Sequence, residues 1–149
     1  MRLFHFFKKE PAFIDPFFGA LRFLDFKSGS CFEGRKTFAP TGVTLDVLID
    51  ADKEGPHPAQ RDFFSEVERN FDLLKTRMTP LIEEEFRNWK EDFIIREFDK
   101  EFSLVHLHIP RQDARPHQWE LAFTSIHDPD HHITIEFEGL DPQGILIDG

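Results

Sequence analysis

Apolar residues occupy every second position between residues 43 and 50, and this period is typical of a strand with one buried face. Two earlier segments are also rich in apolar residues, at 13–26 and 31–38. Residues typical of turns separate the three segments, at 27–30 and 39–42. The first fifty residues are therefore predicted to form a three-stranded antiparallel meander.

The period changes to that of helices after residue 55. Pro58 suits the first helical position, because the N–H that proline lacks has no partner there. One apolar stripe at helical spacing runs through Phe63, Val67, Phe71, Leu74 and Met78. A second stripe, after Thr79 and Pro80, runs through Ile82, Phe86, Trp89 and Phe93. Because proline inside a helix costs about 3 kcal/mol, we predict two helices that meet at Pro80, with one helix kinked there as the alternative.

A period of two returns near residue 102. A strand is predicted to begin there, and one of its faces is expected to carry Ser103, Val105, Leu107 and Ile109. Further strands are expected at 119–124, 133–138 and 145–147. The order of strands, then helices, then strands is typical of an α+β domain. We predict a single domain over residues 1–149, with a mainly antiparallel sheet and the helices packed on one of its faces.

The composition agrees with one folded domain. The chain has 149 residues, of which 40% are hydrophobic, with 19 Phe and no Tyr, and a chain of this length buries about 68–70% of its unfolded surface. Lys8, Lys9 and Glu10 interrupt the apolar N-terminus before it reaches the length of a signal peptide, and no apolar run approaches a membrane span. We expect a cytoplasmic protein without a membrane partner, in which Cys31, the single cysteine, is reduced and half-buried.

The net charge of −10 is unevenly distributed along the chain. Residues 1–59 carry 8 basic and 8 acidic side chains, residues 60–109 carry 8 and 12, and residues 110–149 carry 2 and 8. An acidic surface of this kind argues against a nucleic-acid partner and speeds association with basic proteins, although acidity also serves solubility. The candidate binding residues lie on predicted helix faces and one strand face: Glu66, Asp72, Glu83, Glu84, Glu136 and Glu138.

Histidines of the C-terminal half form a candidate zinc site: His106, His108, His127, His131 and His132. His106 and His108 share a face because side chains alternate along a strand, and zinc takes three or four N, O or S ligands. Alternatively, residues 128–130 (Asp-Pro-Asp) form a turn between two strands, and the histidines are surface residues. Asp50 begins a segment similar to half of a calcium loop, but the twelfth position holds Arg61 where a glutamate is required.

Motifs of nucleophilic and phosphate chemistry are absent from the sequence. It contains neither a Gly-x-Ser-x-Gly elbow nor a phosphate loop. Glu136 and Glu138 share a predicted strand face, but a carboxylate pair suits acid–base work only inside a cleft. No catalytic residue is therefore predicted.

Four segments, at 13–19, 42–52, 58–64 and 133–139, look like parts of a family of small, uncharacterised bacterial proteins, a domain of unknown function. The resemblance covers most of the chain and implies no reaction and no catalytic motif. In size, acidity and α+β pattern the chain is also similar to the immunity proteins of bacterial toxin systems. That likeness implies a basic toxin, such as a nuclease, as the partner.

Three functions are compatible with these patterns. The preferred hypothesis is a non-enzymatic acidic binding protein, for example an immunity-type inhibitor of a basic toxin. The first alternative is a metal-binding protein or metal-dependent hydrolase that uses the five histidines. The second is a self-assembling structural module, in which Phe4, Phe6 and Phe7 are exposed on the monomer and covered in a homodimer.

Overall fold

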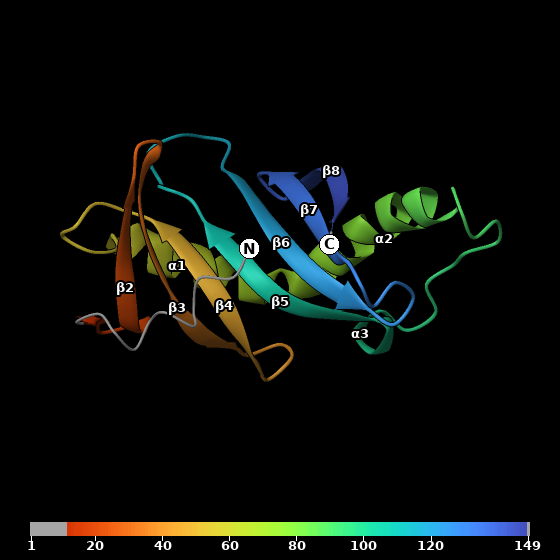
Figure 1. The fold of residues 1–149 in the computed structure, drawn as a ribbon, viewed down its shortest axis with the longest axis horizontal. Helices are drawn as coiled ribbons and strands as arrows, with labels where there is room; N and C mark the ends of the chain where they lie inside the picture. Colours follow the sequence, from red (N-terminus) through yellow and green to blue (C-terminus); the bar gives the residue numbers. More distant parts are fainter. Residues whose placement is uncertain (1–11, 149) are drawn as a thin grey trace.

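Eight strands form one sheet whose spatial order follows the order of the chain (Figure 1). The computed structural model describes residues 12–148. The elements are β1 (Phe13–Asp15), β2 (Gly19–Phe26), β3 (Gly29–Phe38), β4 (Val43–Asp50), α1 (Pro58–Arg69), α2 (Phe71–Phe86), α3 (Phe98–Glu101), β5 (Phe102–Ile109), β6 (Gln118–Ser125), β7 (His132–Glu138) and β8 (Asp141–Asp148). The sheet is mostly antiparallel, as predicted, and β2, β3 and β4 form the predicted meander.

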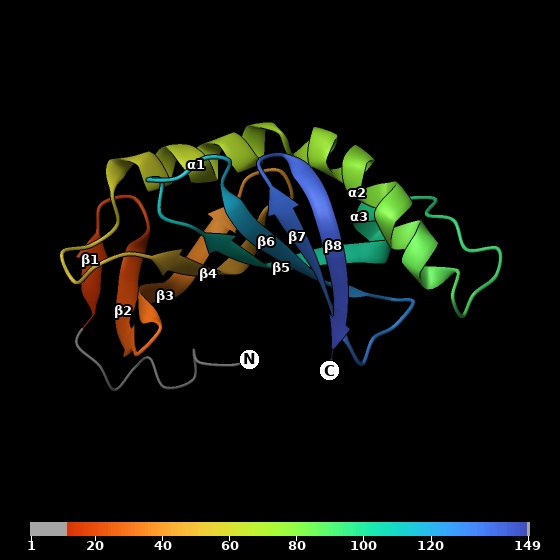
Figure 2. The ribbon, with the colours of Figure 1, turned by 90° about the horizontal axis from the view of Figure 1, so that it is seen from above.

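The strands β4 and β5 are the parallel pair of this sheet. Parallel neighbours need a crossover connection, which the chain supplies through α1 and α2. Figure 2 shows these two helices running along one side of the sheet. Their apolar side chains join those of β2 to β7 in a single buried cluster. The crossover therefore brings the end of β4 beside the end of β5, although many residues separate them in sequence.

Alternation of buried and exposed residues confirms the predicted periods in β4, β6 and β7. In β4, Leu45, Val47 and Ile49 are fully buried, whereas Leu48 and Asp50 are half-buried on the opposite face. In β7 the buried residues alternate with polar ones. In β6 the same period holds, except that Ala122 on the opposite face is buried as well. These strands therefore present one face to the core and a second face of different chemistry.

The prediction for β5 is wrong at its first residues. Phe102 and Leu104 are buried, whereas Ser103 is exposed. A β-bulge between Leu104 and His106 adds one unpaired residue to this strand. Because one extra residue moves all preceding side chains to the other face, Ser103 leaves the face that carries the buried Leu107.

The predicted break at Pro80 is also wrong, because α2 runs through Pro80. The helices instead separate at Asn70, whose backbone N–H and side-chain amide both donate to the carbonyl of Glu66. Pro80 and Thr76, the residue whose carbonyl loses its partner to proline, both lie on the exposed side of the helix. A fully buried stripe holds the helix across this point: Leu74, Met78, Ile82 and Phe86.

The second helix ends earlier than predicted, at Phe86. Trp89, expected on the same stripe, is 47% exposed. Phe93 is buried from the following loop, where its ring centroid lies 4.8 Å from that of Phe86. Both side chains thus contact Phe86 without continuing the helix.

The last strand, β8, is an edge strand and is longer than predicted. It begins directly after the turn at Gly139 and Leu140, and a bulge near Phe137 accommodates its early residues. No helix in residues 12–148 has the length and apolar character needed to cross a membrane. Phe4, Phe6 and Phe7, the predicted dimer contacts, lie outside the described residues.

Candidate functional site

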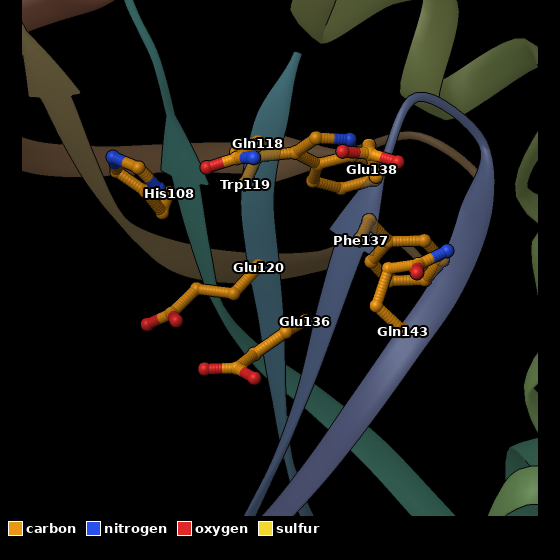
Figure 3. A pocket seen from close by; sticks show the side chains of 8 residues that line it. All are labelled: His108, Gln118, Trp119, Glu120, Glu136, Phe137, Glu138 and Gln143. Carbon is orange, nitrogen blue, oxygen red and sulfur yellow. The ribbon is translucent and has the colours of Figure 1, made fainter. Parts of the chain in front are cut away.

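The strongest candidate site is a pocket of about 450 Å³ over β6 and β7 (Figure 3). Its lining residues are His108, Gln118, Trp119, Glu120, Glu136, Phe137, Glu138 and Gln143. The polar side chains among them come from the sheet face opposite the buried cluster. We call this face, which carries Asp50, His108, Glu120, Glu136 and Glu138, the polar face.

Strand pairing places two carboxylates side by side in this pocket. Glu120 of β6 is the register partner of Glu136 of β7, and Gln118 is the partner of Glu138. Figure 3 shows the side chains of His108, Glu120 and Glu136 extending to the same side of the strands. Directly opposed like charges destabilise a sheet, so this pairing lowers the stability of the isolated domain.

The pKa of Glu120 reflects this environment. Burial raises the pKa, since a half-buried carboxylate is poorly solvated. His108 acts in the opposite direction, whereas the negative charges of Glu136 and Asp148 raise the pKa further. The net result is a pKa above the ordinary value of 4.5, so Glu120 holds a proton more readily than a free glutamate.

A glycine on the neighbouring strand leaves room for the second carboxylate. Gly144 of β8 is the register partner of Glu136. A Cβ atom at Gly144 would lie 3.1 Å from Oε1 of Glu136, which is closer than ordinary van der Waals contact. The carboxylate of Glu136 therefore occupies space that a larger residue on β8 would take.

At the other side of the pocket, His108 pairs with Asp50. Nε2 of His108 lies 2.8 Å from Oδ2 of Asp50, and the parallel register of β4 and β5 brings these residues together. This contact orients the imidazole beside the carboxylates. Asp50 also begins the segment that is similar to half of a calcium loop. Its side chain lies on the polar face and pairs there with His108.

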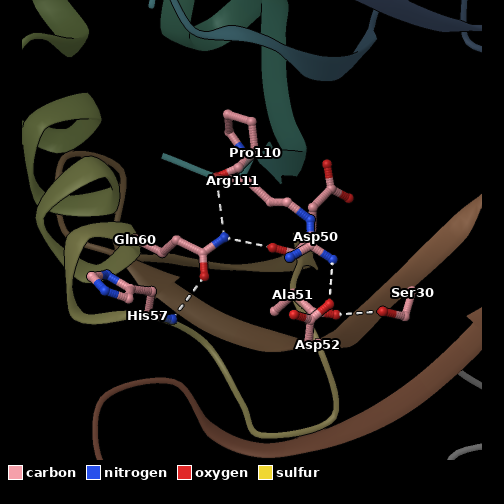
Figure 4. A network of polar contacts seen from close by, with 8 residues as sticks. All are labelled: Ser30, Asp50, Ala51, Asp52, His57, Gln60, Pro110 and Arg111. Carbon is pink, nitrogen blue, oxygen red and sulfur yellow. Dashed lines mark hydrogen bonds and ion pairs between the residues drawn. The ribbon is translucent and has the colours of Figure 1, made fainter. Parts of the chain in front are cut away.

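A hydrogen-bond network at the ends of β4 and β5 holds this arrangement (Figure 4). Nε2 of Gln60 donates to the carbonyl oxygens of Asp50, at 2.7 Å, and Pro110, at 3.1 Å. Arg111 binds Asp52 across the same junction at 2.9 Å. Gln60 lies in the first turn of α1, so the start of the helix fixes where the two strands end.

The candidate zinc ligands do not converge. His106 and His108 share the polar face of β5, as predicted, whereas Nε2 of His127 lies 2.9 Å from Oε1 of Glu101. Nδ1 of His131 lies 2.7 Å from Asp128, and this hydrogen bond raises the pKa of His131. His132 begins β7. Among the described residues, no three His, Cys, Asp or Glu side chains are arranged to hold a metal ion. Zinc binding and metal-dependent hydrolysis stay predictions.

The predicted acidic residues fall into two separate groups. Glu136 and Glu138 lie on the polar face of β7. The helix residues lie on the other layer, where Asp72 pairs with Lys75 at 3.3 Å and Glu83 accepts the N–H of Ile95 at 2.8 Å. Glu84 is exposed, and Glu66 lines a different pocket. The six acids therefore do not form one surface.

Sequence reasoning missed Glu120 as a member of the site. A partial signal exists, because the predicted hairpin between the strands at 119–124 and 133–138 brings position 120 close to Glu136 and Glu138. The turn at 128–130, taken as the centre, pairs position 120 with Glu138, whereas the actual register pairs it with Glu136. The predicted turn is present, with the N–H of His131 bonded to the carbonyl of Asp128. The pairing of Asp50 with His108 has no comparable local signal, since 58 residues separate the two.

No family model, no curated protein and no solved structure matches the chain. Function is therefore inferred from the residues of the site.

Proposed function

We propose that this chain is a non-enzymatic binding protein, and that its polar face receives a basic segment of a partner protein. In this arrangement α1 and α2 pack on one face of the sheet and leave the other face for the partner. The single observation that supports the proposal is the carboxylate pair Glu120 and Glu136. It lies in a half-buried pocket with no Lys or Arg among its lining residues in the described chain.

Three acids elsewhere in the strands and loops have arginine partners. Asp46 pairs with Arg35 at 3.5 Å, Asp52 with Arg111 at 2.9 Å, and Asp141 with Arg77 at 2.8 Å. The pocket acids are instead placed next to one another, with His108 as their neighbouring base. A lysine or arginine of a partner would relieve this repulsion and lower the pKa of Glu120.

The class of partner follows from charge. Residues 110–149 carry 2 basic and 8 acidic side chains, and this part of the chain forms β6, β7 and β8. The complementary charge is that of a basic toxin, which an immunity-type protein would inhibit in the cytoplasm. A nuclease is a suitable example of such a toxin, because its own substrate is anionic. Binding of this kind needs no catalytic residue on the present chain.

The test uses a short lysine-rich peptide as the probe, titrated into the protein at low salt by calorimetry. Replacing both Glu120→Gln and Glu136→Gln is expected to weaken binding by about tenfold or more. The matched control replaces Asp72→Asn and Glu84→Gln on α2, which removes the same charge from the other layer, and it is expected to leave binding nearly unchanged.

Two results would contradict the proposal. If the α2 control weakens binding as much as the sheet variant, the peptide responds to net charge alone or to the helix face. If the sheet variant binds as tightly as the unmodified protein, the polar face is not the binding surface. A neutral peptide of equal length serves as the reference for non-electrostatic binding. Added salt is expected to weaken binding of the lysine-rich peptide more than binding of the neutral peptide.

A further inference from the structure

The polar face continues from β4 onto β3 and β2. Cys31 of β3 is the register partner of Asp50, and Leu24 of β2 is the partner of Cys31. Residues paired in this way point to the same side of a sheet. Glu33, two residues beyond Cys31, lies on that side as well, because side chains alternate along a strand. We call Leu24, Cys31 and Glu33 the covered part of the polar face.

This covered part is buried, although the helices α1 and α2 lie on the opposite side of the sheet (Figure 2). Glu33 is fully buried, Cys31 is 6% exposed and Leu24 is 9% exposed. Neither Leu24 nor Cys31 belongs to the cluster that includes the apolar side chains of the helices. Glu136, at the far end of the same face, is exposed. A layer other than α1 and α2 therefore shields this part of the face from water.

Arg22 of β2 accounts for only part of the shielding. Its Nη1 atom lies 3.2 Å from Oε1 of Glu33, which is its register partner on β3. The side chain of Arg22 is itself only 17% exposed, so it too is largely covered. Removing an ion pair from water costs free energy unless other contacts compensate for it. Burial of apolar side chains over β2 and β3 would supply that compensation.

The position of residues 1–11 suits this cover. They precede β1, whose Phe13 pairs with Leu21 of β2, and so they join the described chain at the covered end of the sheet. A strand spacing of about 4.8 Å places β4 roughly 14 Å and β6 roughly 24 Å from β1. Eleven extended residues span up to about 36–40 Å. The segment is therefore long enough to cross β2 and β3 and to approach the carboxylates of β6 and β7.

The composition of residues 1–11 matches both parts of the face. Apolar side chains suit the covered part, where Leu24 and Cys31 lie. Basic side chains suit the acidic part, where Glu120 and Glu136 lie. The apolar residues of the segment are Leu3, Phe4, Phe6 and Phe7, and its basic residues are Arg2, Lys8 and Lys9, against the single acid Glu10.

We infer that residues 1–11 pack across the polar face of their own chain. Their apolar side chains cover β2 and β3, and their basic side chains approach the carboxylates beside the pocket. The burial of the covered part is that of a single chain, so a second copy is not required for it. One consequence rests on the proposed function: the segment competes with the basic segment of the partner for Glu120 and Glu136.

The packing is tested first in the unmodified protein, by NMR. Nuclear Overhauser effects are expected between ring protons of Phe4, Phe6 or Phe7 and the methyl groups of Leu24. A mixture of isotope-labelled and unlabelled protein shows whether these contacts form within one chain. Contacts that form only between chains would overturn the inference, because the phenylalanines would then hold a homodimer together.

The accessibility of Cys31 gives a second, independent measurement. Replacing Phe4→Ser, Phe6→Ser and Phe7→Ser together is expected to raise the rate at which native Cys31 reacts with iodoacetamide by about tenfold or more. The matched control replaces Leu73→Ser and Ile94→Ser, two exposed apolar residues on and after α2, and it is expected to leave the rate unchanged. Urea unfolding verifies that both variants are folded, and the NMR contacts do not depend on either variant.

Competition is tested with the lysine-rich peptide. Replacing Arg2→Gln, Lys8→Gln and Lys9→Gln together is expected to tighten peptide binding by about fivefold or more. The control variant removes the same charge from exposed lysines elsewhere, through Lys53→Gln, Lys90→Gln and Lys100→Gln. This control is expected to change the affinity much less.

The outcomes separate the inference from the proposed function. Absence of contacts between the phenylalanines and Leu24, or an unchanged rate at Cys31 in the serine variant, overturns the packing of residues 1–11. Equal gains in peptide affinity for the two glutamine variants overturn the competition, because net charge then explains both. A peptide that binds none of the three proteins overturns the proposed function and the competition, whereas the NMR contacts decide the packing separately.

Discussion

Replacing Glu101→Gln is expected to destabilise the fold strongly, although the change preserves size. Glu101 ends α3 and is 9% exposed. Its Oε2 atom accepts the backbone N–H groups of Arg96, at 2.8 Å, and Glu97, at 2.7 Å, and its Oε1 atom lies 2.9 Å from Nε2 of His127. One carboxylate thus ties the loop after α2 to the turn after β6.

The magnitude follows from these contacts. A hydrogen bond to a charged group contributes about 1.5–3 kcal/mol. Glutamine keeps a single acceptor oxygen and carries no charge. Either the two backbone N–H groups then face an amide N–H, or they keep the oxygen and His127 loses its charged acceptor. Because the contacts share one side chain and are not additive, we expect the free energy of unfolding to fall by about 2–4 kcal/mol at neutral pH.

The effect should depend on pH in a defined direction. Burial raises the pKa of Glu101, but hydrogen bonds from the backbone of Glu97, from His127 and from the backbone of Arg96 outweigh it, and the folded pKa lies below the ordinary 4.5. The ionised form therefore favours the folded state. This contribution is fully present above the unfolded pKa and is lost as the pH falls through the lower folded value, so the difference between the unmodified protein and the variant should shrink in acid.

The assay is urea unfolding followed by tryptophan fluorescence, at neutral pH and at several acidic values. The matched control is Glu97→Gln, four residues earlier, whose carboxylate pairs with the exposed Lys100 at 3.2 Å. An exposed pair of this kind contributes about 0–1 kcal/mol. The reasoning is refuted if Glu101→Gln costs no more than the control, or if its cost does not change in acid.

Three further predictions concern single residues of α2 and β3. Pro80→Ala should raise the free energy of unfolding by about 1–2 kcal/mol, because it restores a hydrogen bond inside α2 at the expense of a more flexible unfolded chain; a loss of stability on urea unfolding would show that the helix needs its proline. Gly34→Ala should lower that free energy by about 1–3 kcal/mol, because the added Cβ would collide with Cδ2 of Leu21, and an unchanged unfolding midpoint would contradict this packing. Cys31 should react with iodoacetamide far more slowly in the native protein than in urea. Burial, and then the negative charges of Asp50 and Glu33, raise the pKa of its thiol to about 11, and only the thiolate reacts. Equal rates of modification in the two conditions, measured by mass spectrometry, would disprove this prediction.

Much of the fold follows from local patterns in the sequence. The alternation in residues 43–50, 119–124 and 133–138 corresponds to β4, β6 and β7, and Pro58 occupies the first position of α1 as predicted. These elements are predictable because the period of apolar residues reports directly which face is buried. The pairing of Glu136 and Glu138 on one strand face follows from the same period.

Packing decided the points at which local patterns failed. The bulge before His106 places Ser103 and Leu107 on different faces, and nothing in the alternation itself marks where an extra residue enters. Pro80 stays within α2 because the fully buried Met78 and Ile82 on either side of it belong to one core. In both cases the burial of neighbouring apolar side chains outweighs a local preference of the backbone.

The candidate site shows the same division. Sequence alone indicated an acidic C-terminal part and identified Glu136, Glu138 and His108 as residues of interest. The tertiary structure decided the register that opposes Glu120 and Glu136 within the predicted hairpin, and it alone brought Asp50 to His108. The reason is physical: a periodic pattern determines the direction of a side chain within its own strand, whereas the neighbour that it meets depends on the register between strands. The loop between β6 and β7 sets that register for Glu120 and Glu136. The crossover through α1 and α2 sets it for Asp50 and His108, over a long distance in sequence.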